Sequence, residues 1–280
     1  MMSFNNSSSG DRAVLEAAAH WWKRLRAEPA EELSAEFLEW ASEPRNSDAF
    51  IPMSRALGPA QSYYGTGLAE IKYSVNGLSA GVAEYYTPQN LNILYTELNW
   101  TPKFGAEYGL KLSGQYTDEQ SVGNSLSLAG NPAHSNTGIR ITFGAAGFVF
   151  ALAYSYTSSD GNLINAWGSN PSYTNGLAKN RNRAGEQGGL GSASYDFGKL
   201  GFAGLSASAV YAYGWSAIDP GTSAPLPNQH ELDLTLDYRV PKTIFKGLWL
   251  RVQRLVVQAV GEPEASSEWR VILNWEIPLI

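Results

Sequence analysis

The chain has 280 residues, of which 44% are hydrophobic, 12% aromatic and 16% charged, and it contains no cysteine. The lack of cysteine excludes a disulfide-stapled domain and a Cys-ligated metal site. A net charge of -6 argues against nucleic acid as a partner, because binding to phosphates needs a basic surface. No window approaches the roughly 18 consecutive apolar residues of a membrane helix, so a membrane crossing would have to use strands.

The first 60 residues have a helical composition that differs from the rest of the chain. Residues 1–10 are rich in Asn and Ser, which predicts a disordered tail, and they lack the basic and apolar stretches of a secretory signal. In residues 11–60 we predict three short helices. The first begins at Asp11, a capping residue, and ends at Pro29. Its apolar residues recur at three- and four-residue steps: Val14, Ala18, Trp21, Trp22 and Leu25.

Three short motifs in this helical segment resemble the N-terminal cytoplasmic domain of FecR-type sigma-factor regulators. They are Trp21-Trp22-x-Arg24-Leu25, Phe37-Leu38-x-Trp40-Ala41 and Glu43-Pro44-Arg45-Asn46-x-x-Ala49-Phe50. The resemblance implies that residues 11–57 bind a sigma factor, as part of a cytoplasmic regulatory fusion. The alternative is an amphipathic helical hairpin with no specific function.

From residue 61 onward the side-chain pattern has a period of two. Residues 230–239 are the clearest case, with Leu232, Leu234, Leu236 and Tyr238 on one face and Glu231, Asp233, Thr235, Asp237 and Arg239 on the other. The pattern recurs in residues 139–143, 148–156, 248–253 and 270–277. Such alternation indicates strands between an apolar and a wet environment. Counting these runs predicts about eleven strands.

The connections between these strands differ in length on the two sides of the predicted sheet. Short turns such as Asn76-Gly77 alternate with long Gly, Ser and Asn-rich loops at residues 117–136, 158–188 and 216–229. This pattern is typical of an antiparallel outer-membrane β-barrel. A soluble β-sandwich shows the same alternation. Aromatic residues near the strand ends of the apolar face favour the barrel, in the outer membrane of a Gram-negative bacterium.

Several motifs in residues 61–280 resemble, in their order, the OprD family of substrate-specific outer-membrane porins. They are Tyr154-Ser155-Tyr156-Thr157, Asp160-Gly161, Trp167-Gly168-Ser169, Asn182-Arg183-Ala184-Gly185-Glu186, Gly204-Leu205-Ser206, Gly247-Leu248-Trp249-Leu250-Arg251 and the runs at 194–201, 231–239 and 270–279. The resemblance implies passive diffusion of small carboxylate-bearing solutes, such as amino acids and aromatic acids. It also implies an eighteen-stranded barrel, relative to which eleven strands are incomplete. An open sheet leaves unpaired backbone groups in lipid, so the missing closure puts conduction in question.

The resemblance also implies which residues line the pore. It places Arg140, Arg239, Arg251 and Arg270 in the lumen, and Arg181 and Arg183 in a long loop that folds into it. A row of guanidinium groups attracts carboxylates. The acids expected to face them, and so to select solutes with both charges, are Asp196, Asp233, Asp237 and Glu276. The alternative for each residue is an ordinary charge that keeps the lumen wet.

Two further observations complete the expectations. Arg254 has the lipid-facing parity of its strand, where a charge costs roughly 2–4 kcal/mol. The histidines His20, His134 and His230 lack ligand-like spacing, and no phosphate loop or nucleophile motif occurs. We therefore expect no metal, no cofactor and no enzyme activity, and the expected partners are outer-membrane lipid and the solute.

Overall fold

The computed structural model describes residues 66–103, 105, 107–123, 133–165, 171–241, 245–261 and 265–275. The predicted tail at 1–10, the predicted helical segment at 11–60 with its sigma-factor interaction, and Glu276 lie outside these residues. Within them, helical structure is confined to one short 3-10 turn, and no helix is long and apolar enough to cross a membrane.

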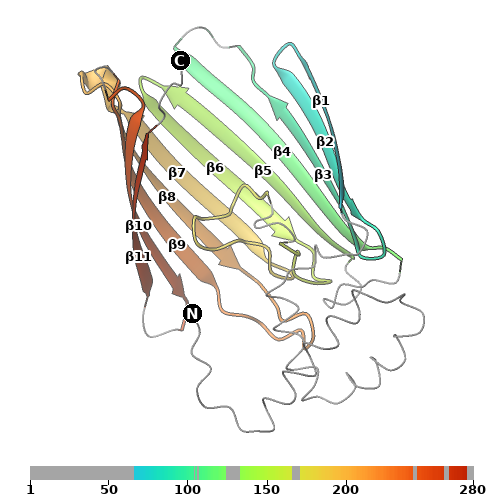
Figure 1. Ribbon diagram of the computed structural model, residues 1–280. Helices are drawn as coiled ribbons and strands as arrows, with labels where there is room; N and C mark the ends of the chain where they lie inside the picture. The colour runs from blue at the N-terminus through green and yellow to red at the C-terminus, as the bar shows by residue number, and fades with distance from the viewer. Residues whose placement is uncertain are drawn as a thin grey trace. The chain divides into compact units, whose positions relative to one another are not determined.

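Eleven strands form one sheet in chain order, which confirms the predicted strand number. They are β1 (Gly67–Val75), β2 (Leu78–Thr87), β3 (Leu91–Trp100), β4 (Tyr108–Ser121), β5 (Ala133–Ala145), β6 (Phe148–Thr157), β7 (Gln187–Asp196), β8 (Leu205–Trp215), β9 (Gln229–Arg239), β10 (Leu248–Ala259) and β11 (Ser266–Trp275), with the 3-10 turn η1 (Phe197–Leu200) between β7 and β8. Figure 1 shows the strands as long arrows laid side by side. Since the number is odd, the two edge strands β1 and β11 run in the same direction.

Tight turns join the strands at one end of the sheet, which we call the turn end. Asn76 and Gly77 (φ 48° and 82°) connect β1 to β2, and Ala146 and Gly147 (φ 51° and 88°) connect β5 to β6. Positive φ at both central residues is the geometry of the two-residue hairpin turn that matches strand twist. The opposite end, the loop end, carries the long connections at residues 158–186 and 216–228. The predicted asymmetry of turns and loops is therefore present, but the predicted loop at 117–136 is too long, because β4 extends to Ser121 and β5 begins at Ala133.

The two faces of the sheet differ as the alternation predicts. On β9, Leu232, Leu234 and Leu236 are 37%, 44% and 49% exposed, whereas Glu231 and Asp233 are 0% and 2% exposed. The first set defines the outer face and the second the inner face. An apolar face left this exposed needs a non-aqueous partner, and lipid supplies one.

Aromatic side chains cluster near both ends of the strands. At the turn end the Phe148 and Tyr195 rings lie 4.3 Å apart, and Tyr108 stacks on Phe143 at 6.2 Å. At the loop end, the Trp215 ring contacts Tyr213 at 5.7 Å and Tyr154 at 6.2 Å. Two such belts are expected where amphipathic rings sit at the two interfaces of a membrane.

Candidate functional site

The described parts of the long connection between β6 and β7, residues 158–165 and 171–186, lie on the inner face, and we call them the inner loop (Figure 1). On the β4 side, the Ile164 N–H donates to Glu119 Oε2 at 2.7 Å, and Gln115 Nε2 donates to the Pro171 carbonyl at 2.8 Å. Both β4 side chains are buried beneath the loop. Backbone groups of the loop thus find partners on the strand it covers.

Two carboxylates of β9 hold the other side of the inner loop. Glu231 accepts hydrogen bonds from the Ala178 N–H at 2.6 Å and the Lys179 N–H at 2.9 Å. Asp233 accepts from the Leu177 N–H at 3.0 Å. Bonds from N–H groups to a carboxylate are stronger than neutral ones, so β9 fixes the path of the loop.

Arg181 belongs to this anchor. Its side chain is 0% exposed and lies 3.9 Å from Glu231 Oε2. It also donates to the Lys179 carbonyl at 3.1 Å and the Ala212 carbonyl at 3.2 Å. A Cβ at Gly214 would overlap the Glu186 carboxylate and the Arg181 side chain, so glycine at this position of β8 makes room for both side chains. Arg181 therefore holds the loop against the sheet.

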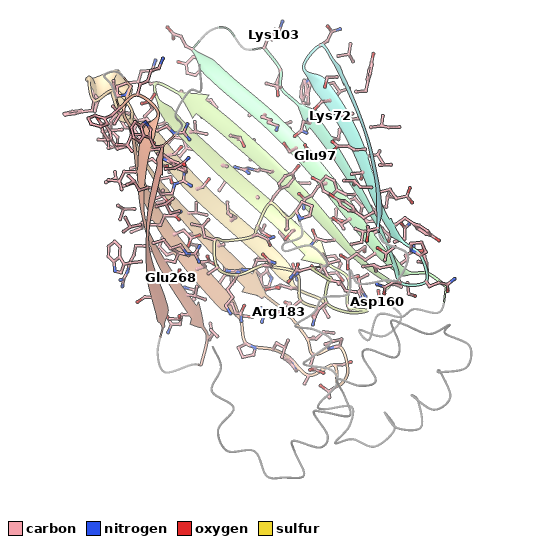
Figure 2. The ribbon with its side chains drawn as sticks, in the orientation of Figure 1. Lys72, Glu97, Lys103, Asp160, Arg183 and Glu268 are labelled. Carbon is pink, nitrogen blue, oxygen red and sulfur yellow. The ribbon has the colours of Figure 1, made fainter. Side chains whose placement is uncertain are left out.

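Arg183 is also paired. It donates to Glu186 Oε1 at 2.7 Å and to the Pro227 carbonyl at 2.9 Å, which links the inner loop to residues 216–228 (Figure 2). Glu186 is fully buried and accepts the Arg183 N–H as well, at 3.0 Å. Both loop arginines thus have carboxylate partners.

A second group of predicted residues meets near the turn end of β9 and β10. Asp237 and Arg251 lie directly opposite each other in the register, and the guanidinium donates to both carboxylate oxygens at 2.7 and 2.9 Å. Trp249 Nε1 donates to the same carboxylate at 2.9 Å. The Arg239 and Arg251 guanidinium carbons lie 5.0 and 4.5 Å from the Trp249 ring centroid. Arg239 is exposed and has a cation–π contact.

The remaining predicted residues lie apart from these groups. Arg270 forms a bidentate ion pair with Glu268 on its own strand, in which Nε donates to Oε1 at 2.6 Å and Nη2 donates to Oε2 at 3.1 Å. Asp196 accepts the Gly198 N–H at 2.8 Å and so caps η1 at the turn end. The structure thus brings Arg181 together with Glu231 and Asp233, and Asp237 together with Arg239 and Arg251, but it does not gather the nine predicted residues that it describes into one row.

Arg140 differs from the other predicted arginines. It lies on β5 opposite Ser113 of β4, and its Nε is buried without a hydrogen-bond partner. Within the described residues it has no carboxylate within 4 Å. Tyr173 of the inner loop lies within electrostatic reach of both Arg140 and Glu97. Burial and the Glu97 carboxylate raise the pKa of Tyr173, so the phenol stays protonated beside the guanidinium.

Three further residues, Lys72, Lys111 and Glu97, complete this region. We call Lys72, Lys111 and Arg140 the basic cluster, and Glu97 lies among them. The Glu97 carboxylate of β3 interacts electrostatically with the ammonium groups of Lys111 and Lys72. Its oxygens accept hydrogen bonds from Tyr95 at 2.8 Å and from Asn99. Figure 2 shows Lys72 and Glu97 on neighbouring parts of the sheet. The basic cluster thus contains cations without a described carboxylate within 4 Å, whereas the acids around β9 lie beside arginines.

Sequence reasoning missed several residues of the inner face. Glu97, Lys72 and Lys111 were not selected, although period-two parity along β1, β3 and β4 places them on the polar side. The anchoring roles of Glu119 and Glu231 carry no local signal, because their partners are distant in sequence. Glu186, by contrast, pairs with Arg183 only three residues earlier. Within the described part of the chain, no three His, Asp or Glu side chains gather into a group that would hold a metal.

The chain was compared with known protein families. The family model described as outer membrane porin, OprD family, matches residues 33–279. The chain belongs to the OprD family. The match begins inside the segment whose motifs resemble FecR-type regulators, and no comparison supports that second resemblance. The predicted OprD resemblance is confirmed. A comparison with curated proteins found no significant match.

Solved porin structures from Pseudomonas aeruginosa share the fold. OccK8 (OprE) has a TM-score of 0.69 and 19% identity, covering 80% of this chain and 62% of its own. OccK9 (OpdG) has a TM-score of 0.68 and 22% identity, covering 76% and 54%. OpdK, solved with vanillate, has a TM-score of 0.68 and 18% identity, covering 75% and 55%. This OprD-family chain thus spans little more than half the length of these structures.

Proposed function

We propose that the sheet forms the wall of an outer-membrane diffusion channel, and that Arg140 is the main contact for small solutes bearing a carboxylate. The observation that carries the proposal is which inner-face arginines are ion-paired with a carboxylate and which are not. Arg181, Arg183, Arg251 and Arg270 are each neutralised by a carboxylate of the chain. Among the predicted arginines that the structure describes, Arg140 alone is partly buried and has no described carboxylate within 4 Å, and it lies beside the inner loop.

The chemistry around Arg140 suits a carboxylate. A guanidinium with free donors binds both oxygens of a carboxylate in one plane, and a protonated Tyr173 adds a neutral donor. Lys72 and Lys111 raise the local concentration of anions. The similar structure solved with vanillate supports this class of solute.

Conduction requires closure of the sheet. The N–H and C=O groups along the free edges of β1 and β11 need hydrogen-bond partners from other strands, because lipid offers none. Because these edges run in the same direction, antiparallel closure needs an odd number of additional strands, supplied from outside the described residues. The family architecture of eighteen strands would add seven.

Planar bilayer recording on the full chain tests the proposal. After refolding in detergent and addition to one chamber, we expect stepwise conductance increases in potassium chloride. Benzoate added at rising concentration should reduce the single-channel current, because it occupies Arg140, whereas benzamide, which lacks the charge, should not. Benzoate and benzamide that reduce the current equally would contradict the proposed solute class, and a chain that inserts without conducting would contradict the channel.

A further inference from the structure

A groove of about 580 Å³ lies across strands β6 to β11, and most of its lining residues belong to the outer face. Its floor consists of small side chains, Ala193 of β7 and Ala207 and Ala209 of β8. On one side it is walled by Phe148 and Tyr195, whose rings lie 4.3 Å apart. These small residues between bulky walls form a groove in a surface that otherwise presents large apolar side chains.

The opposite wall contains Arg254, which has the outer-face parity. In the register, Ala193, Ala209, Leu234, Arg254 and Trp269 lie opposite one another in a single row across β7 to β11. The Arg254 guanidinium carbon lies 5.0 Å from the centroid of the Trp269 ring. The groove thus has an apolar floor and a cation at one wall.

Arg254 has no acidic partner among the described residues. Four arginines, Arg181, Arg183, Arg251 and Arg270, have a carboxylate within 4 Å. Arg254 has none among the described residues, and it contacts the Trp269 ring instead. Its neighbours in the groove, Leu234, Leu236 and Val252, are all apolar. A charge on a lipid-facing surface is unfavourable unless an opposite charge or a polar group reaches it. No described residue supplies the compensating charge, so an anionic ligand is suited to supply it.

We propose that this groove binds an anionic membrane lipid, with an acyl chain along the Ala193, Ala207 and Ala209 floor and its phosphate accepting hydrogen bonds from Arg254. The inference rests on the proposed membrane location of the sheet, but not on conduction. Guanidinium groups bind phosphate oxygens bidentately, and contact with the Trp269 ring holds the guanidinium in place. The groove volume lies within the range of small-ligand sites.

Native mass spectrometry of the full refolded chain tests the proposal, with phosphatidylglycerol and phosphatidylcholine of identical acyl chains as probes. We expect phosphatidylglycerol to bind about fivefold more tightly than phosphatidylcholine, and Arg254→Gln to remove this preference. Arg270→Gln is the matched control. It removes the same charge from the adjacent row on the inner face, where Arg270 lies opposite Gln253, and should leave the preference intact. Ala209→Leu, which fills the floor, should weaken binding of both lipids.

Equal binding of the two lipids by the unaltered chain, or an equal loss in Arg254→Gln and Arg270→Gln, would overturn the lipid site. Protease protection in vesicles of phosphatidylcholine separates this result from failure of the membrane location. A chain that inserts into those vesicles but shows no phosphatidylglycerol preference contradicts the groove alone. A chain that does not insert at all contradicts the proposed function together with the groove.

Discussion

Glu231→Ala is expected to lower the free energy of unfolding by about 3–5 kcal/mol, the cost of breaking a buried ion pair. The substitution removes the acceptor for the Ala178 and Lys179 N–H groups and leaves the fully buried Arg181 guanidinium facing no carboxylate at that position. Buried donors without acceptors lose their hydration and gain nothing in return. Urea titration of the refolded chain, followed by tryptophan fluorescence, measures the change.

Glu268→Ala is the matched control for this measurement. Glu268 pairs with Arg270, but both side chains are exposed to solvent, so the loss should be far smaller than that of Glu231→Ala. A loss from Glu231→Ala that is no larger than that of Glu268→Ala would contradict the anchoring role. In bilayers, Glu231→Ala should also increase current noise, because the inner loop is released from β9.

Arg140→Glu is expected to shift the channel from anion to cation preference, with the chloride-to-potassium permeability ratio falling by about tenfold. The substitution changes the charge by two units beside the inner loop, where Arg140 has no carboxylate partner to cancel it. Reversal potentials in a potassium chloride gradient give the ratio. Arg140→Gln should produce a smaller shift in the same direction.

Arg254→Gln is the control for this second prediction. It removes one positive charge, as Arg140→Gln does, but from the outer face, so the reversal potential should stay that of the unaltered chain. Equal shifts from Arg140→Gln and Arg254→Gln would show that net charge, rather than position on the inner face, sets the selectivity. An unchanged reversal potential in Arg140→Glu would remove Arg140 from the permeation path.

The strands and their faces were predictable because the information is local. On β9 each residue alternates between apolar and polar, and the structure places Leu234 outward and Asp233 inward accordingly. The tight turn at Asn76 and Gly77 is encoded in two adjacent residues with positive φ. Patterns of this kind need no knowledge of the rest of the chain.

The pairing of charges was not predictable in the same way. Arg251 lies opposite Asp237 only because the β9 to β10 connection sets that register, and a one-residue slip would move every side chain to the other face. Arg181 and Glu231 are distant in sequence and meet because the inner loop crosses the sheet. The period-two alternation identified charged residues of the inner face. It did not distinguish Arg140 from the arginines that form ion pairs with carboxylates of the chain.

A cysteine scan of β9 tests the central claim, that lipid covers the outer face and water the inner face. The chain has no native cysteine, so single cysteines at positions 232, 234, 236, 235 and 239 accept a fluorescent label cleanly. In vesicles, lipids brominated on their acyl chains should quench labels replacing Leu232, Leu234 and Leu236, and aqueous iodide should quench those replacing Thr235 and Arg239. Iodide quenching of all five labels, with none quenched by brominated lipid, would contradict the account.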